Sequence, residues 1–256
     1  MTESTEARPF RLAYVPGVTP AKWVRIWGER MPESPLELIA VDAADAAAAL
    51  REDRADAALL RLPVERDGLS VIPLYAEVPV VVVPKDHVFT AAEQIALADL
   101  ADELVLDPLD TPLAWHQLPG RPALDRPSST GDAIALVAAG VGVVVVPQSL
   151  ARLHHRKDLT YRPVDGAPES RVALSWVEDR TTDLVEEFIG IVRGRTANSS
   201  RGRNPAQTPK SKTGKSTGLG PREQTQARSG KPRTQDRRRA AGKSGSKSRT
   251  GGRRRR

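Results

Sequence analysis

The order of apolar and polar positions divides the first quarter of the chain into short alternating segments. Strand-like apolar runs occupy residues 10–15 (FRLAYV), 36–41 (LELIAV) and about 55–62, and helical patterns occupy residues 20–30 and 45–53. Strands that alternate with helices at this spacing predict an α/β fold with mainly parallel sheets. In such folds ligands are expected at the carboxyl ends of the strands.

Turn-forming residues interrupt the pattern in the middle of the chain. Two further strands, LSVIPLY and VPVVVVP, lead into a second unit, and proline-rich loops surround a short helix that we expect near Trp115. A capped helix over residues 131–139, a valine strand, the short helix QSLARLHH and two late strands come next. A closing amphipathic helix then places Leu184, Phe188 and Ile189 on one face.

The composition changes near residue 197. The tail, residues 198–256, contains 19 Lys and Arg but only two acidic residues, for a net charge of +17. The preceding part holds 20 basic and 30 acidic residues, so the overall +7 averages an acidic body and a basic tail. The tail is rich in Ser, Gly, Thr and Pro and cannot bury enough apolar area to offset chain entropy, so we expect it to be disordered when free.

Several function classes lack their usual signatures. The chain has no cysteine, no G-x-S-x-G turn, and four histidines without metal-ligand spacing. We therefore expect no catalytic residues, no metal, no cofactor and no enzymatic activity. The acidic start lacks the pattern of a secretory signal, and the longest apolar stretch is too short to span a bilayer, so we expect a cytoplasmic protein without membrane contact.

The stretch VAAGVGVVVVPQS, residues 137–149, contains two closely spaced glycines, as a dinucleotide-binding loop does. That motif needs a strand, then G-x-G-x-x-G, then a helix, whereas Gly140 and Gly142 follow a helix and precede a strand, and the third glycine is replaced by Val145. We instead expect Gly140 to end the helix in the left-handed region and the valines to form a buried strand. The glycines could then let the backbone approach a ligand.

Two helix starts are candidate anion sites. Thr19 precedes Pro20 after the first strand, and Ser128, Ser129 and Thr130 precede the helix that leads to the paired glycines. Free backbone N–H groups and hydroxyls at a helix N-terminus bind anions, but the same residues also serve as ordinary caps. The sequence leaves both readings open.

Together these segments resemble the effector-binding, or substrate-binding, domain of LysR-type transcriptional regulators, a two-lobed fold like the type 2 periplasmic binding proteins. The resemblance spans residues 9–195 and is carried by four stretches: FRLAYVPGVTP, PLELIAVDAADAAAALREDRADAALLRLP, PLYAEVPVVVVPKDHVF and VAAGVGVVVVPQSL. It implies that lobe one contains about residues 10–82 and 163–193, that lobe two contains about 83–162, and that two crossing strands join them.

The resemblance also implies a small-molecule effector, an organic acid or an amino-acid-like metabolite, in the cleft between the lobes. Matched position by position, the ligand-binding residues would be Thr19, Leu62, Pro63, Ser129, Thr130, Val141 and Gly142. The two anion-ready helix starts would then face each other.

The resemblance implies subunit contacts as well. In the family the first helix often packs against a second subunit, so Trp23 and Trp27, four apart on one face, are either core residues or contact residues. The partner could be a second copy of this chain or a full-length LysR-type regulator. Only about nine residues precede the first strand, where the family carries a winged helix-turn-helix, so we do not expect operator reading by that element.

The basic residues of the tail could bind the phosphates of nucleic acid. We expect no sequence preference, because no aromatic residues that could contact bases lie among them. The main candidate contacts are Arg201, Arg203, Arg237, Arg238, Arg239, Arg253, Arg254, Arg255 and Arg256. Three alternatives stay open: a merely solubilising tail, a vestigial ligand-binding protein, and an enzyme on the same fold. The enzyme would need Asp42, Asp107 or His116 to converge in the cleft.

Overall fold

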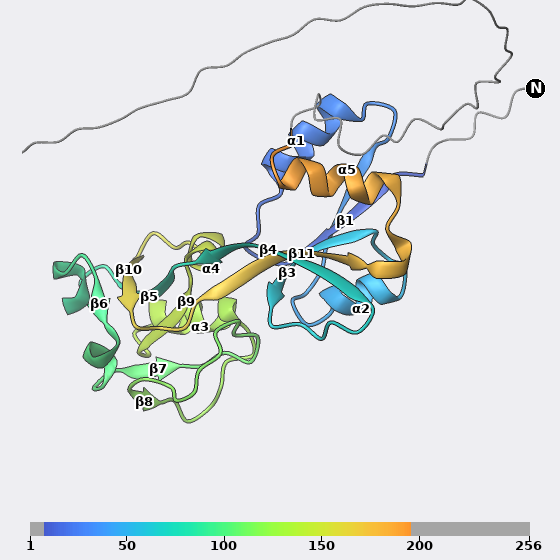
Figure 1. The fold of residues 1–256 in the computed structure, drawn as a ribbon. Helices are drawn as coiled ribbons and strands as arrows, with labels where there is room; N and C mark the ends of the chain where they lie inside the picture. The colour runs from blue at the N-terminus through green and yellow to red at the C-terminus, as the bar shows by residue number, and fades with distance from the viewer. Residues whose placement is uncertain (1–7, 196–256) are drawn as a thin grey trace, which may run out of the picture. The chain divides into compact units, whose positions relative to one another are not determined.

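The computed structural model describes residues 8–195, and the tail with its nine candidate arginines lies outside that range. The described part contains two sheets, each with its own helices (Figure 1). We call the two parts lobe one and lobe two. The α/β class expected from the alternating pattern is confirmed, and five of the nine strand pairings are parallel.

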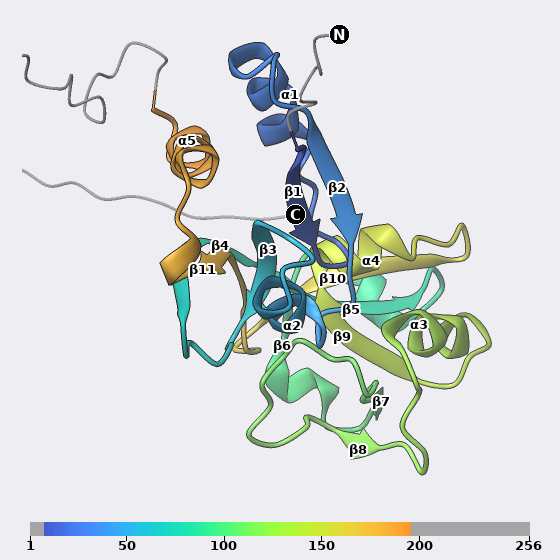
Figure 2. The ribbon, with the colours of Figure 1, turned by 90° about the vertical axis from the view of Figure 1, so that its right-hand side faces the viewer.

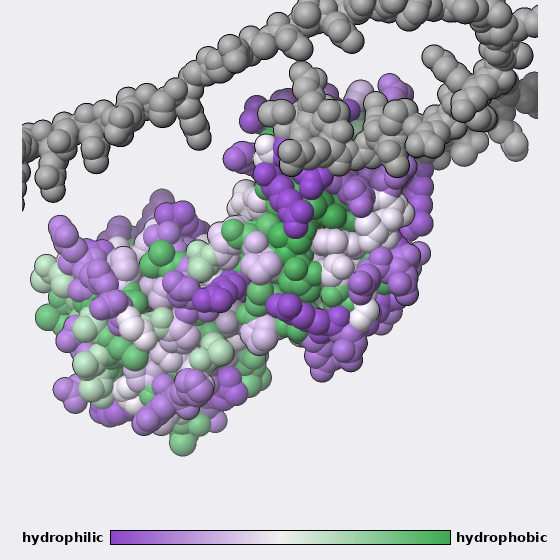
Figure 3. Space-filling model, viewed as in Figure 1, coloured by the Kyte–Doolittle hydropathy of each residue, from purple (hydrophilic) through white to green (hydrophobic). Residues whose placement is uncertain are grey.

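Lobe one is built on a five-stranded sheet of order β2-β1-β3-β11-β4. Strand β1 is parallel to β2 and β3, whereas β11 is antiparallel to β3 and β4. Its strands are β1 (Phe10–Tyr14), β2 (Leu36–Ala40), β3 (Ala57–Leu62), β4 (Leu69–Glu77) and β11 (Ser170–Val177), and its helices are α1 (Ala21–Arg30), α2 (Ala46–Arg51), η3 (Glu178–Arg180) and α5 (Asp183–Val192). On the face seen in Figure 3, hydrophobic residues gather over this sheet and hydrophilic residues surround them.

An aromatic cluster forms the centre of lobe one. The ring of Phe10 in β1 stacks on Trp27 of α1 at 4.6 Å, and Phe188 of α5 lies 5.4 Å from Phe10. Trp27 is buried, and its indole N–H donates to the carbonyl oxygen of Ser34 at 2.7 Å. The same core holds Trp23 at its partly buried margin. Trp27 is therefore a core residue, and α1 and α5 pack together through this cluster.

Lobe two is built on a six-stranded sheet of order β6-β10-β5-β9-β7-β8. Its strands are β5 (Pro79–Pro84), β6 (Ile95–Ala96), β7 (Leu104–Leu106), β8 (Arg121–Pro122), β9 (Val143–Pro147) and β10 (Leu159–Asp165); its helices are η1 (Val88–Ala91), η2 (Leu97–Leu100), α3 (Thr130–Ala138) and α4 (Gln148–Leu153). Helices α3 and α4 both pack on β5 and β9, and Figure 2 shows α3 beside β9.

The valine runs of β5 and β9 are explained by burial on both faces. In β5, Val80 and Val82 enter the core under α3 and α4, whereas Val81 and Val83 enter the core on the opposite face with Phe89. Alternate residues of a strand point to opposite faces, so a strand covered on both sides needs apolar residues at every position. The valine strand expected after Gly142 is confirmed as β9.

The chain passes from the sheet of lobe one to that of lobe two before residue 82, the boundary that we expected. It returns to the sheet of lobe one after residue 162, the other expected boundary. Strand β4 ends at Glu77, and β5 already pairs with β9 and β10 from Pro79 onward. On the return path β10 continues to Asp165 before β11 begins at Ser170. The apolar run that crosses Val78 hides this exchange of partners, because hydrophobicity alone does not show which strand a residue pairs with.

Two local predictions were wrong. No helix forms near Trp115, because the residues from 107 to 120 are irregular and Pro108, Pro112 and Pro119 recur too closely for a helix. Trp115 instead packs partly buried against the core of lobe two. Thr19 does not cap α1: Pro20 is the N-cap residue, and no side chain caps that helix.

Candidate functional site

A cavity of about 830 Å³ lies between the two lobes. Lobe one contributes residues at the carboxyl ends of β1, β2 and β3. Lobe two contributes the loop after β7, the first residues of α3, and Leu150, Leu153 and His154 from the middle and C-terminal end of α4. The lining residues are Pro16, Asp42, Ala43, Ala44, Arg61, Leu62, Pro63, Leu109, Asp110, Thr111, Pro112, Leu113, Ala114, Ser128, Ser129, Thr130, Gly131, Leu150, Leu153 and His154. The cavity thus lies at the strand ends where a ligand was expected.

Arg61 of β3 lies at the base of this cavity, where the two crossing strands leave lobe one. Its guanidinium forms an ion pair with Glu77 at the end of β4, and both side chains are buried. It also donates to the hydroxyl of Ser170 at the start of β11, at 2.9 Å. Across the lobes it donates to the hydroxyl of Ser149 in α4 at 3.2 Å. One side chain thus contacts both crossing strands and the second lobe.

The protonation state of Arg61 follows from its burial. Desolvation lowers the pKa of Arg61 to about 10, because water no longer stabilises its charge. A pKa near 10 still leaves the guanidinium protonated at neutral pH. The guanidinium that faces Glu77 is therefore charged under ordinary conditions.

The start of α3 is capped by its own residues. Ser129 is the N-cap residue, and its hydroxyl accepts the backbone N–H of Asp132 at 3.1 Å. The hydroxyls of Ser128 and Ser129 donate to the Asp132 carboxylate at 2.9 and 2.8 Å. These hydrogen bonds hold the pKa of Asp132 below its ordinary value, because they stabilise the charged form.

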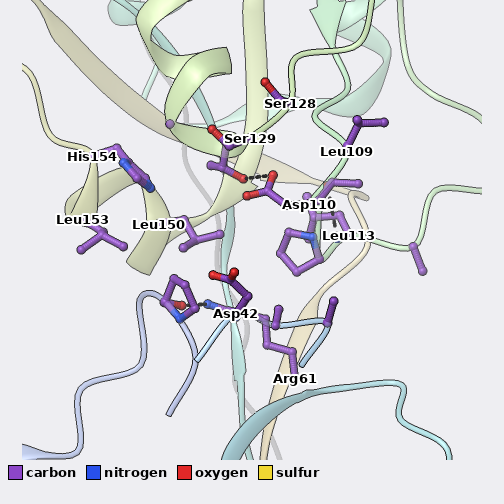
Figure 4. A pocket seen from close by; sticks show the side chains of 18 of the residues that line it. Asp42, Arg61, Leu109, Asp110, Leu113, Ser128, Ser129, Leu150, Leu153 and His154 are labelled. Atoms are coloured by element: carbon purple, nitrogen blue, oxygen red, sulfur yellow. Dashed lines mark hydrogen bonds between the residues drawn. The ribbon is translucent and has the colours of Figure 1, made fainter. Parts of the chain in front are cut away.

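Thr130 joins the start of α3 to the loop after β7. Its side chain is buried, and its hydroxyl donates to the carboxylate of Asp110 at 2.9 Å. Figure 4 shows Asp110 pointing into the cavity from lobe two and Asp42 pointing into it from lobe one. Each lobe therefore contributes one carboxylate to the cavity.

Four of the seven ligand-binding residues expected from the sequence line the cavity together. They are Leu62 and Pro63 at the end of β3, and Ser129 and Thr130 at the start of α3. The other three, Thr19, Val141 and Gly142, do not line it. The two helix starts therefore do not face each other across the cavity.

The paired glycines lie at the far end of lobe two from the cavity. They connect the C-terminus of α3 to the start of β9, whereas the cavity touches the first turn of α3 and the helix after β9. Gly140 has a φ of 80°, and the N–H groups of Gly140 and Val141 donate to the carbonyls of Val137 and Leu136, which is the hydrogen-bond pattern of a Schellman motif. The C-cap role of Gly140 is confirmed.

Gly142 approaches protein backbone. Its φ is 88°, and a Cβ atom there would overlap the carbonyl oxygen of Leu104 in β7. Gly142 therefore allows β9 to pack closely against β7. We had expected it to let the backbone approach a ligand.

The chain matches the protein-family model described as the LysR substrate binding domain over residues 5–197. The chain belongs to the LysR substrate-binding domain family.

Transcriptional regulators with similar sequences agree with this family assignment. Over 184 residues the domain is 27% identical to the HTH-type transcriptional regulator AlsR of Bacillus subtilis, covering 66% of this chain and 59% of that protein. A probable hydrogen peroxide-inducible genes activator of Mycobacterium avium is 32% identical over 54% of this chain and 49% of its own length. This chain thus spans about half to three-fifths of the length of these relatives.

Solved structures show the same fold. The oxidised form of OxyR superimposes with a TM-score of 0.58 at 22% identity, covering 75% of this chain and 99% of the other. The BenM effector-binding domain with its effector benzoate gives a TM-score of 0.60 at 20% identity, covering 73% and 90%. At these identities the likeness to these structures concerns the fold alone.

Sequence reasoning missed several residues that line the cavity of this LysR substrate-binding domain. Asp42 was named only for the enzyme alternative, and neither Asp110 nor Arg61 was expected in the site. One signal was available: Arg61 interrupts the apolar run ALLRLP, and a charged residue inside a buried strand needs a partner. Asp110 carried no such signal, because aspartate is common in loops.

Of the three residues named for an enzyme on this fold, only Asp42 lines the cavity in the described part of the chain. Asp107 pairs with Arg126 at 3.0 Å, and His116 does not line the cavity. Within residues 8–195 no group of three His, Cys, Asp or Glu side chains could hold a metal ion. None of the helices described has the length and apolar character that a membrane span requires.

Proposed function

We propose that this chain is the effector-binding part of a LysR-type regulatory system in the cytoplasm and that it senses a small molecule rather than catalysing a reaction. The observation that carries the proposal is the cavity between the lobes, bounded by residues at or after β1, β2, β3 and β7 and by residues of α3 and α4. Polar groups converge there on apolar walls, as in typical small-molecule sites. The regulator relatives support a role in transcription.

The proposed mechanism uses the two crossing strands as the connection between lobes. A ligand that contacts Leu62 and Pro63 on one side and Ser129 and Thr130 on the other would favour one arrangement of the lobes over others. Arg61 contacts both crossing strands and α4, so it would transmit that preference to the connection between the lobes. A homodimer, or a heterodimer with a full-length regulator, would then carry the signal.

A blocked cavity tests the sensing function. Ala114 is an exposed lining residue, so Ala114→Trp should fill the cavity without disturbing the core. We expect the wild-type chain to gain thermal stability with at least one compound of a broad metabolite panel, and Ala114→Trp to lose that gain. Ala101→Trp, at an exposed position outside the cavity, should keep it. Absence of any stabilising compound, or an equal gain in Ala114→Trp, would contradict the proposal.

We propose in addition that the basic tail retains the protein on nucleic acid without sequence preference. Deleting residues 198–256 removes 19 basic residues, so we expect DNA binding at low salt to be lost in a mobility-shift assay. For the full chain the logarithm of the affinity should fall linearly with the logarithm of salt concentration. A chain with Arg237, Arg238, Arg239 and Arg253 changed to Gln should show a shallower slope. Unchanged binding after the deletion would refute this role of the tail.

A further inference from the structure

The charge balance of the cavity is unusual for a receptor of organic acids. The lining residues that can carry charge are Asp42, Arg61, Asp110 and His154. A site for a carboxylate needs a free cation or free hydrogen-bond donors. The side-chain donors of Arg61, Ser128, Ser129 and Thr130 can each be followed to a partner within the protein.

The guanidinium of Arg61 is already occupied. It has two terminal nitrogens with four N–H groups, and these nitrogens make four hydrogen bonds: to Glu77, to the hydroxyls of Ser170 and Ser149, and to the carbonyl of Pro16 at 3.0 Å. The carboxylate of Glu77 also neutralises its charge. Arg61 therefore supplies little attraction for a ligand carboxylate.

The hydroxyl donors at the start of α3 are also occupied. Ser128 and Ser129 donate to Asp132, and Thr130 donates to Asp110. Both acceptors are carboxylates of the protein itself, which offset the positive end of the helix dipole. The helix start that the sequence suggested as an anion site thus carries its own anions.

Two carboxylates in the cavity are available to a ligand. Asp42 follows β2 in lobe one and Asp110 follows β7 in lobe two, and Figure 4 shows both carboxylates pointing into the space between the lobes. Neither has a lysine or arginine partner among the ion pairs of the described residues. Two like charges on facing lobes repel each other when the lobes approach, and a cation between them would reverse that effect.

The walls of the cavity restrict the rest of the ligand. Leucines and prolines surround the acidic positions: Leu62, Pro63, Leu109, Pro112, Leu113 and Leu150. An apolar skeleton would lose water-exposed area against them. A bare divalent cation would gain nothing from these walls, and the described residues contain no group of three His, Cys, Asp or Glu side chains that could hold a metal ion.

We propose that the effector carries a protonated amine on an apolar skeleton and that Asp42 and Asp110 hold the amine between the lobes. This inference rests on the proposed function, because it assumes that the cavity binds an effector. It narrows the expected class, organic acid or amino-acid-like, to molecules with a cationic nitrogen. The apolar part lies against the leucines of both lobes, and the ammonium group replaces repulsion between the two carboxylates with attraction to each.

Matched pairs of compounds test this charge preference. Each primary amine of a panel is compared with the carboxylate of the same skeleton, beginning with benzylamine and benzoate, by thermal shift and calorimetry on the full chain. We expect stabilisation by amines and none by their carboxylate partners. Stabilisation by carboxylates at equal or lower concentration would overturn the amine proposal and leave effector binding intact. No stabilisation by any compound would contradict the proposed function itself.

Two neutral variants identify the groups responsible. Asp42→Asn and Asp110→Asn keep the size of each side chain, and an Asn at 110 can still accept from Thr130. We expect each to raise the Kd of the best amine about tenfold or more, since a charged hydrogen bond is lost. Asp125→Asn, at an exposed position outside the cavity, should leave the Kd unchanged. Unchanged affinity in both cavity variants, or stabilisation by MgCl2 or ZnCl2 alone that Asp42→Asn abolishes, would overturn the proposal.

Discussion

Replacing Arg61 with methionine is expected to lower the free energy of unfolding by about 3–5 kcal/mol. The substitution leaves the carboxylate of Glu77 and the hydroxyl of Ser170 buried without the partner that each has now. Uncompensated burial of a charge costs much more than the ion pair itself contributes, because the carboxylate has left water without gaining an opposite charge. Urea unfolding followed by circular dichroism measures the loss.

A double substitution distinguishes the cost of burying Glu77 without an opposite charge from the cost of losing the other contacts of Arg61. Arg61→Met with Glu77→Met removes both charges, so we expect it to recover most of the stability lost in Arg61→Met alone. Arg61→Lys keeps the charge but cannot reach Glu77, Ser170 and Ser149 together, and should fall between wild type and Arg61→Met. A loss below about 1 kcal/mol in Arg61→Met would show that Glu77 is not buried as described.

The fold was predictable where the pattern of apolar residues is long and regular. The strands around Leu59 and Val144 and the closing helix with Phe188 were found because their burial imposes a periodic pattern on the sequence. Between residues 107 and 120 the proline-rich loops were predicted, but the helix expected near Trp115 was wrong, since no periodicity marks a segment that is held by a core contact of Leu113. The pattern of apolar residues thus predicts which residues are buried better than it predicts the conformation of irregular backbone.

The site was predictable only in part, for a related reason. Ser129 and Thr130 were found because hydroxyl residues mark a helix start, and a helix start has a recognisable local sequence. Asp42 and Asp110 come together from loops 68 positions apart in the chain, and no local signal records that proximity. Their interaction with a ligand depends on how the two lobes are placed, which is a property of the whole fold.

Gly142 was identified from the sequence as important, but the reason given was wrong, and a matched pair of substitutions tests the new one. Both Gly140 and Gly142 have positive φ values, at 80° and 88°. A Cβ at Gly140 would enter open space, whereas a Cβ at Gly142 would overlap backbone atoms of Leu104 in the neighbouring strand. The φ angles are therefore similar at the two positions, whereas the space available to a Cβ atom differs.

Gly142→Ala is expected to lower the free energy of unfolding by about 3 kcal/mol or more, and Gly140→Ala by only about 1–2 kcal/mol. The smaller value is the cost of a left-handed conformation for alanine, and the remainder is the cost of separating β9 from β7. Affinity for a cavity ligand should change little in either folded variant, because neither glycine lines the cavity. Equal losses of stability at the two positions would refute the close packing of Gly142 on Leu104. Loss of ligand affinity in Gly142→Ala with unchanged stability would instead restore the original assignment of this glycine to the ligand site.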